Sequence, residues 1–309
     1  MTLQQLRCFC EVVNQGLNLS RAARVLHTSQ PAITRMIRGL EDELGVQLLM
    51  RLGPRIAAIT EEGQQVLGFA LQILQDVRNI KLAAGDKRNA GTGLLRVGTT
   101  NLQARHALVD VARRFVEAYP EVSLTMAQGT PAEVADWVSR GMVDVGVSTL
   151  PAELPRNVVR FEAYAIHRCI IAPRGHAILK KRRPSLAQLA QNRLIMYDNQ
   201  LDTGAVVRKA FDAAGIFPRI TLRTTDAGLV KDYVAAGLGI AVIQTMAFDA
   251  ARDTALGMVM AGHLFPPSTA WITVRRDQFL RGFMIDFIGM VAPRWTRTEI
   301  ERARMRAAG

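Results

Sequence analysis

The chain has 309 residues, of which 49% are hydrophobic and 21% charged, and its formal net charge is +12. This length suits two or three domains, and the hydrophobic content can build packed cores, so an intrinsically disordered chain is excluded. The positive charge favours an anionic partner, although basicity alone does not distinguish DNA from RNA or lipid.

The first 17 residues predict a helix that is buried on one face. Its apolar residues at helical spacing are Leu3, Leu6, Phe9, Val13 and Leu17. Charged and amide residues stand where a signal peptide needs an apolar run, and no stretch of about 20 apolar residues could span a membrane. We therefore expect a cytoplasmic protein without membrane contact.

The cysteines are Cys8, Cys10 and Cys169, too few for a disulfide framework. Cys8 and Cys10 stand two apart on the predicted helix and so point in different directions. No CxxC pair or histidine cluster has the spacing of metal ligands. We expect buried structural thiols and no metal site, with a redox-sensing thiol as the alternative.

Residues 18–44 predict two short helices joined by a tight turn. The first helix has an apolar face formed by Leu19, Ala22, Ala23 and Leu26. Ser29 can cap the second helix, and Pro31 is tolerated in its first turn because the missing N–H was unpaired there. The second helix should bury Ile33, Ile37, Leu40 and Leu44. Its outward residues are expected to be Gln30, Thr34, Arg35 and Arg38.

A helix pair that exposes amide, hydroxyl and guanidinium groups is suited to reading a DNA major groove, so we interpret the pair as a helix-turn-helix. The alternative is an ordinary helical hairpin with a solvated polar face. Residues 48–59 favour DNA, because two short strands around a Gly-Pro turn form a basic wing that suits phosphate or minor-groove contact. The expected DNA-binding residues are Thr28, Ser29, Gln30, Pro31, Thr34, Arg35, Arg38, Arg51 and Arg55.

Residues 61–87 carry apolar positions in alternating steps of four and three. They are Val66, Ala70, Ile73, Val77, Ile80 and Ala84. This heptad pattern predicts a long helix paired with another helix, and a helix lying on its own domain is the alternative. The Gly-rich segment 85–93 would then be a short linker.

From residue 94 strands alternate with helices, which indicates a parallel sheet with helices on its faces. The first series has strands at 94–98, 122–126 and 143–147 and helices at 103–118 and 132–139. A second series has strands at 194–196, 220–224 and 240–243 and helices at 203–214 and 227–236. The repetition predicts two lobes with a cleft between them.

Polar residues stand where these strands end and helices begin. In open α/β sheets a ligand lies beyond the carboxyl ends of the strands, where helix N-termini direct free amides outward. Hydroxyl groups from both lobes suit a small anion or polar acid, although a single threonine at a helix start is often only a cap. The candidates are Thr99, Thr100, Asn101, Ser148, Thr149, Thr203 and Thr225, the last beside Asp226.

An enzyme is disfavoured because the chain has no GxSxG elbow, Walker loop or GxGxxG opening a helix. An extracytoplasmic binding protein would not need residues 18–60, and a nucleoid-associated protein would not need two α/β lobes. We expect neither catalysis nor a cofactor.

The motifs resemble those of LysR-type transcriptional regulators, and most closely the CysB branch, which governs sulfur assimilation. The matching stretches are LQQLR at 3–7, TSQPAI at 28–33, LEDELG at 40–45, QAR at 103–105, TDA at 225–227, GLG at 237–239 and AP…TR at 292–297. The resemblance runs the length of the chain.

The resemblance implies an all-α winged helix-turn-helix with a long coiled-coil linker helix, followed by an α/β two-lobed effector domain similar to periplasmic binding proteins. The expected ranges are 1–60 for DNA binding, 61–92 for the dimerisation helix and hinge, and 93–309 for the effector domain. Lobe I would hold 93–163 and 270–292 and lobe II 164–269, with chain crossings near 162–166 and 267–271.

The CysB branch holds sulfate or an acetylated serine with a Thr-Thr-x-Thr-Gln run after the first strand. Here residues 99–103 read TTNLQ, so Leu102 replaces one hydroxyl, and Ile166 replaces a tryptophan near the lobe crossing. Both departures make the expected pocket more apolar, so an organosulfur compound or another small anion is as open as sulfate. The resemblance adds Gln103 and Ile166 to the effector-binding candidates.

The expected function is DNA-binding transcriptional regulation under a small effector of sulfur metabolism, such as sulfate, thiosulfate, acetylserine or an organosulfonate. The alternative is a LysR-type regulator of an unrelated catabolic pathway that senses a small organic acid. The expected partners are double-stranded promoter DNA, the effector and a second copy paired through the linker helix. The family implies a homotetramer, and RNA polymerase is a further partner if the protein activates.

Overall fold

The computed structural model describes residues 1–53, 55–86, 91–198 and 202–306. The chain divides into two compact units, Met1–Arg88 and Asn89–Gly309, each with hydrophobic core of its own. Pro54 of the predicted turn and residues 87–90 of the predicted linker lie outside the described residues, as do the side chains of Arg55 and Ala84. In the described part of the chain, no helix is both long and apolar enough to cross a membrane.

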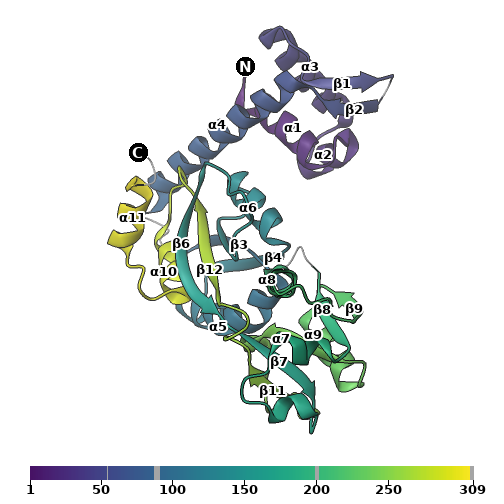
Figure 1. Cartoon of the computed structure of the whole chain (residues 1–309). Helices are drawn as coiled ribbons and strands as arrows, with labels where there is room; N and C mark the ends of the chain where they lie inside the picture. The colour runs from purple at the N-terminus through teal and green to yellow at the C-terminus, as the bar shows by residue number, and fades with distance from the viewer. Residues whose placement is uncertain (54, 87–90, 199–201, 307–309) are drawn as a thin grey trace. The chain divides into compact units, whose positions relative to one another are not determined.

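The first unit begins with helices whose starts are capped by side-chain oxygens (Figure 1). Thr2, Asn18 and Ser29 each accept a hydrogen bond from a backbone N–H of the first turn, which satisfies a donor that a helix start leaves free. Gly45 follows the third helix in the left-handed conformation, with a φ of 69° that glycine adopts without steric penalty. The helices are α1 (Leu3–Asn14), α2 (Leu19–Val25) and α3 (Gln30–Leu44).

The core of the first unit confirms most of the predicted apolar faces. Its fully buried residues include Leu6, Phe9, Ala22, Ile33, Ile37 and Leu40. The prediction of a buried side chain is wrong for two residues, since Leu3 is 41% exposed and Leu44 is 38% exposed. Leu3 is the first residue of α1 and Leu44 the last of α3, and a side chain at the end of a helix extends past the neighbours that bury the middle.

The predicted wing is a two-stranded antiparallel sheet, β1 (Leu49–Leu52) and β2 (Arg55–Ile59), in which Leu49 lies opposite Ile59. A long helix, α4 (Glu61–Asp86), follows it. Within the described part of α4, the predicted heptad positions differ in their exposure. Ala70 is only 1% exposed because this part of α4 lies against α1, whereas Ile80 is 68% exposed. Only the later positions are therefore open to a partner helix.

Among the described residues, the second unit contains two five-stranded sheets, one in each lobe. The order in lobe I is β4-β3-β5-β12-β6, and in lobe II it is β11-β7-β10-β8-β9. The predicted alternation of strands and helices is confirmed in both lobes. Lobe I contains β3 (Gly93–Thr99), η1 (Gln103–Ala107), α5 (Leu108–Ala118), β4 (Val122–Gln128), α6 (Pro131–Ser139), β5 (Val145–Ser148), β6 (Val158–Ile166), β12 (Ser268–Arg275), α10 (Gly282–Val291) and α11 (Arg297–Arg306). Lobe II contains β7 (Arg168–Pro173), η2 (Ala177–Lys180), α7 (Leu186–Ala190), β8 (Leu194–Tyr197), α8 (Asp202–Ala213), β9 (Ile220–Thr224), α9 (Ala227–Ala235), β10 (Ile240–Gln244), η3 (Thr245–Ala247) and β11 (Leu256–Met260).

Strands β6 and β12 lie side by side in lobe I and lead the chain into and out of lobe II (Figure 1). They pair antiparallel, with Ile166 opposite Ser268 at the end next to lobe II. The chain enters lobe II through His167 and returns after β11, so both crossings lie at this end of the pair.

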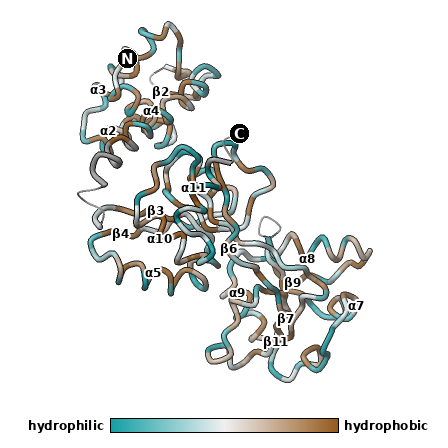
Figure 2. The backbone as a smooth tube through the Cα atoms, turned by 90° about the vertical axis from the view of Figure 1, so that its left-hand side faces the viewer, coloured by the Kyte–Doolittle hydropathy of each residue, from teal (hydrophilic) through white to brown (hydrophobic). Residues whose placement is uncertain are grey.

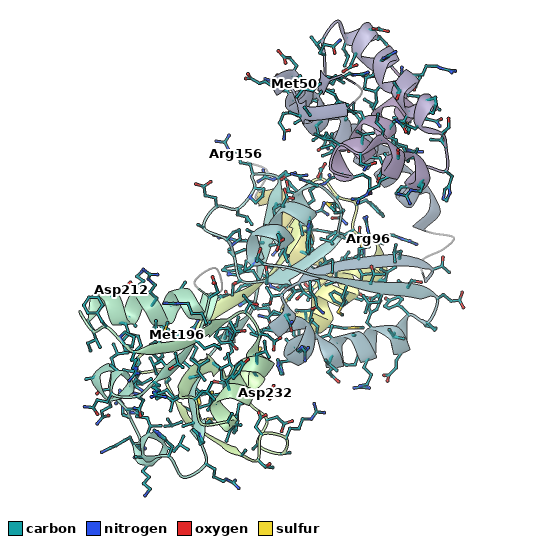
Figure 3. All side chains as sticks on the ribbon, turned by 90° about the vertical axis from the view of Figure 1, so that its right-hand side faces the viewer. Met50, Arg96, Arg156, Met196, Asp212 and Asp232 are labelled. Atoms are coloured by element: carbon teal, nitrogen blue, oxygen red, sulfur yellow. The ribbon has the colours of Figure 1, made fainter. Side chains whose placement is uncertain are left out.

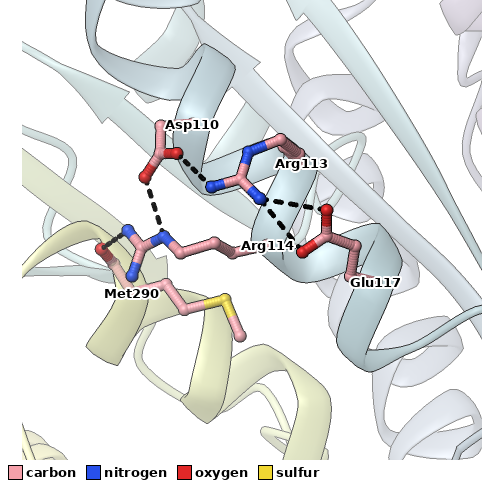
Figure 4. Close-up of polar contacts among 5 residues, drawn as sticks. All are labelled: Asp110, Arg113, Arg114, Glu117 and Met290. Atoms are coloured by element: carbon pink, nitrogen blue, oxygen red, sulfur yellow. Dashed lines mark hydrogen bonds and ion pairs between the residues drawn. The ribbon is translucent and has the colours of Figure 1, made fainter.

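Helix α10 supplies much of the lobe I core and is mostly hydrophobic along the tube in Figure 2. Helix α5 packs on it, and a hydrogen bond of 3.1 Å from Arg114 of α5 to the carbonyl of Met290 of α10 adds to the contact (Figure 4). Within α5 itself, Arg113 pairs with Asp110 at 2.7 Å and with Glu117 at 3.0 Å. The charged groups are exposed and screened by solvent, so these ion pairs contribute little, and the apolar contact with α10 dominates.

Candidate nucleic-acid interface and ligand cavity

Helix α3 presents a polar surface whose position is fixed from two sides. Its N-terminus is capped by Ser29, and Ser20 of α2 donates a hydrogen bond of 2.9 Å to the Gln30 side chain. Thr34 is half-buried and donates to the Gln30 carbonyl at 3.1 Å. Arg35 and Arg38 are exposed and have no ion-pair partner in the described part of the chain. Both guanidinium groups are therefore free to bind an anion or a base edge.

The structure brings most of the predicted DNA-binding residues to this surface. A shallow groove on α3 is lined by Gln30, Pro31, Thr34, Arg35, Arg38, Gly39 and Asp42. Thr28 and Ser29 are exposed just before the helix, and the Ser29 hydroxyl is used as its cap.

Arg51 of the wing has a structural partner that the sequence did not indicate. Its Nη2 lies 3.1 Å from the Glu41 carboxylate, and the Glu41 side chain is only 3% exposed. Glu41 also accepts hydrogen bonds from the amides of Leu48 and Leu49, at 2.9 and 3.2 Å. Glu41 therefore joins α3 to the wing, and this ion pair holds the guanidinium that we expected to contact phosphate.

We expect Glu41→Ala to lower the free energy of unfolding of the full chain by about 1–3 kcal/mol, because two buried amides lose their acceptor. Chemical denaturation followed by circular dichroism measures the change. Asp42→Ala, at the next and exposed position of the same helix, is the control. Equal stability of the two variants would contradict a structural role for Glu41.

The second unit contains a cavity of about 410 Å³ between its lobes, at the carboxyl ends of the central strands. Residues from η1, β4, α6 and β6 of lobe I and from β8, α8, α9 and β10 of lobe II contribute to its wall. The predicted effector-binding residues that line it are Thr100, Asn101, Gln103, Thr149, Ile166 and Thr225.

Three predicted residues, Thr99, Ser148 and Thr203, do not line this cavity. The hydroxyls of Thr99 and Ser148 donate to backbone carbonyls of Val147 and Thr149, each at 2.8 Å. Thr203 is fully buried and accepts a hydrogen bond of 3.3 Å from Arg168. These hydroxyls are turned into the lobes, because neighbouring residues at a strand end or in the first turn of a helix point in different directions.

Sequence reasoning missed several polar residues of the wall. They include Arg105, His106, Glu133, Tyr197, Asp202 and Gln244, whereas Asp226 was named at the start of its helix beside Thr225. Asp202 stands where α8 begins, and an aspartate at a helix start is a signal that could have found it. Burial lowers the pKa of His106, and nearby Lys231 and Arg105 lower it further, so its imidazole is neutral at pH 7.

A buried guanidinium supports the wall behind Asp202. Arg168 is 0% exposed and lies at the start of β7, next to the chain crossing. It donates to Asp202 at 2.5 Å, to the Ser268 hydroxyl at 2.6 Å and to the Pro266 carbonyl at 2.6 Å. The Ser268 hydroxyl donates in turn to Asp202 at 2.9 Å. This network joins the cavity wall to both crossing segments.

The two lobes also meet through a side-chain hydrogen bond at the cavity. Asn101 of lobe I donates to Asp226 of lobe II at 3.3 Å, and Arg105 donates to Asn101 at 2.9 Å. In lobe I, Arg96 is paired with Asp144 at 2.7 Å and joins β3 to the segment before β5 (Figure 3). That pair fixes the relation of the strand ends that carry Thr100 and Thr149.

The cavity combines apolar surface with polar groups. Its wall offers hydroxyls, amides and carboxylates, and within the described residues no group of three or more His, Cys, Asp or Glu side chains could hold a metal ion. The cysteines are all buried, and burial raises the pKa of Cys10 and Cys169 to about 12, which keeps both as thiols.

Comparison with known proteins gives two family matches. Residues 3–64 match the bacterial regulatory helix-turn-helix protein, lysR family, and residues 88–296 match the LysR substrate binding domain. The chain is 36% identical to the HTH-type transcriptional regulator SsuR of Burkholderia cenocepacia, over 97% of both proteins. It is 37% identical to the HTH-type transcriptional regulator CysB of Haemophilus influenzae, over 98% of this chain and 94% of that protein. The solved cofactor-binding domain of the Cbl transcriptional regulator superposes with a TM-score of 0.65 at 28% identity, covering 69% of this chain and 94% of that domain.

Proposed function

This chain belongs to the LysR family of bacterial helix-turn-helix transcriptional regulators, and from that premise we propose that a small effector of sulfur metabolism controls its binding to promoter DNA. One observation carries the proposal: the same chain exposes free guanidinium groups on α3 and holds, between two lobes, a cavity lined by both apolar and polar groups. A DNA-binding surface and a ligand cavity are the two sites that an effector-controlled regulator requires.

In the DNA-bound state α3 lies in the major groove. Gln30, Thr34, Arg35 and Arg38 contact base edges or adjacent phosphates, with Thr28, Ser29 and Pro31 beside the backbone at the helix start. The wing contacts phosphate through Arg55, and Arg51 supports the wing through Glu41. A dimer sets two such helices into half-sites one helical turn apart, or a multiple of it.

The dimer pairs through α4. On the side turned away from its own unit, α4 exposes Phe69 by 71% and Ile73 by 36%, and further along Ile80 by 68%. Exposed apolar side chains along a helix favour pairing with a second helix. Two such dimers form a homotetramer, and contact with RNA polymerase follows if the regulator activates transcription.

The effector occupies the cavity between the lobes. A ligand that touches both lobes can favour one arrangement of them, and it shifts the DNA-binding equilibrium by its differential affinity for the two states. The similarity to CysB supports an effector of sulfur metabolism: sulfate, thiosulfate, an acetylserine or an organosulfonate.

A thermal-shift series on the full-length protein tests the proposal with sulfate, thiosulfate, acetylserines and alkylsulfonates, and with unrelated carboxylates as controls. A ligand present at a hundredfold excess over its Kd stabilises the fold by about 2.7 kcal/mol. Stabilisation by sulfur compounds alone supports sulfur metabolism. Stabilisation only by carboxylates would support the alternative, a LysR-type regulator of a pathway that senses organic acids.

We expect Thr100→Val to weaken the binding of the stabilising compound by about 10- to 100-fold. Thr100 lines the cavity, and a hydrogen bond from its hydroxyl to a charged ligand contributes about 1.5–3 kcal/mol. Isothermal titration measures the loss, with Thr221→Val at an exposed position of β9 as the control. Equal affinities of the two variants would place the ligand elsewhere.

A further inference from the structure

Carboxylates already occupy the N-termini of three helices that line the cavity, α6, α8 and α9. A helix N-terminus carries partial positive charge and is the usual place where a fold binds an anion. Here Asp226 caps α9 by accepting from the Leu229 amide at 3.0 Å, and Glu133 accepts from the Thr130 amide at the start of α6 at 2.8 Å. Asp202 stands in the first turn of α8. All three carboxylates line the cavity, so the positive ends of these helices are neutralised before a ligand arrives.

The lobe II side of the cavity therefore presents negative charge. Asp226 and Asp202 lie there, and Arg168 offsets Asp202 from behind without lining the cavity. Asp226 is half-buried, and its carboxylate accepts hydrogen bonds from two neutral groups, the Leu229 amide and the Asn101 side chain. A purely anionic ligand would bring like charges together at this wall, which is unfavourable in a partly buried site.

The lobe I side presents the Glu133 carboxylate, which already accepts from the Thr130 amide and hydroxyl at 2.8 Å each, and several hydrogen-bond donors. The phenol of Tyr164 donates to Oε1 of Gln103, which leaves Nε2 of that amide as a donor. The hydroxyls of Thr100 and Thr149 and the guanidinium of Arg105 lie on the same lobe and line the cavity. These groups suit an acidic group of a ligand.

Two buried atoms of the lobe II wall are also unsatisfied. Oε1 of Gln244 and Oη of Tyr197 have no hydrogen-bond partner among the described residues, and the two residues are 7% and 4% exposed. Burial raises the pKa of Tyr197, so its phenol stays a donor. Gln244 therefore requires a donor and Tyr197 an acceptor, as a ligand with both kinds of group would provide.

We propose that the cavity binds a small zwitterion, with its acidic group against the donors of lobe I and its ammonium group against Asp226 and Gln244 of lobe II. The inference rests on the proposed effector site and narrows the effector to amino acids or aminosulfonates. A bare sulfate satisfies only one side of the cavity. The ammonium group also replaces the Asn101 side chain as the donor to Asp226, so the ligand takes over the contact that joins the lobes.

Matched pairs of ligands test the charge requirement on the full-length protein by isothermal titration. The first pair is 2-aminoethanesulfonate and 2-hydroxyethanesulfonate, and the second is 3-aminopropanoate and 3-hydroxypropanoate. Within each pair only the ammonium group differs, so we expect the amino compound to bind at least tenfold more tightly in at least one pair. Equal or tighter binding of the hydroxy compounds, or of sulfate, would overturn the inference of a zwitterion, while the proposal that the cavity binds an effector would stand. Absence of binding by all four would also overturn it, while the sulfate, thiosulfate and acetylserine series decides the proposed function separately.

Asp226→Asn tests the residue that creates the preference. Asparagine caps a helix as well as aspartate, so the variant removes the charge and keeps α9. We expect the preference for the amino compound to fall to about twofold or less. Asp232→Asn, an exposed position of the same helix (Figure 3), should keep the full preference. An unchanged preference in Asp226→Asn would contradict an ammonium group at this wall.

Discussion

Arg168→Met is expected to lower the free energy of unfolding of the second unit by about 3–5 kcal/mol. Methionine fills a similar volume, but it leaves Asp202 without its cation and removes the donors to Pro266 and Ser268. The loss is large because Arg168 is fully buried, so water cannot replace the missing bonds. Chemical denaturation or calorimetry on the full-length chain measures it.

A matched ion pair on the surface provides the control for Arg168. Arg208 and Asp212 lie on α8 with side chains that are 55% and 60% exposed, so Arg208→Met should cost no more than about 1 kcal/mol. The double variant Arg168→Met with Asp202→Leu should recover part of the stability, because it also removes the uncompensated carboxylate. Similar losses in Arg168→Met and Arg208→Met would show that the buried network does not hold the lobe.

Arg35→Ala is expected to weaken binding to a specific operator by about 5- to 150-fold, which corresponds to about 1–3 kcal/mol. The Arg35 guanidinium is exposed on the middle of α3, and it has no ion-pair partner in the part of the chain that the structure describes. The fold and the oligomer should be unaffected, since the side chain takes no part in the core. Fluorescence anisotropy with genomic fragments selected by the protein measures the affinity.

Arg182→Ala removes the same charge from an exposed loop of the second unit and separates a specific contact from a loss of net charge. It should reduce operator affinity only slightly, and equally for unrelated DNA. If Arg35→Ala and Arg182→Ala bind the operator alike, Arg35 lies outside the DNA interface.

Local patterns in the sequence were sufficient for most of the fold. Helix spacing around Ile33 and Ile37 and the Ser29 cap located α3, because a helix face and its cap depend on neighbouring residues. The strand and helix alternation in both lobes was predictable for the same reason. Strands β6, β7, β11 and β12 were not predicted, because no helix lies between β6 and β7 or between β11 and β12, and because the pairings β7–β11 and β6–β12 join distant segments.

The cavity was predicted in position but only partly in composition. Strand ends located Thr100 and Thr149, because parallel strands end at the same edge of a sheet. We predicted Thr203 in the cavity wall, but its neighbour Asp202 lies there instead. Which of the two faces the cavity depends on the rotation of α8 about its axis, and the buried Arg168, from another part of the chain, sets that rotation. The pairing of Arg51 with Glu41 was missed for a similar reason, since it joins the wing to a different helix.

We propose that a ligand in the interlobe cavity controls DNA binding. The most direct test of this control is the operator Kd of the full-length protein, measured with and without a saturating amount of the compound that gives the largest thermal shift. We predict that the compound changes this Kd by about 5- to 150-fold, the range of typical couplings between two sites, and that Thr100→Val reduces the change. An operator Kd that is the same with and without saturating ligand would contradict effector control.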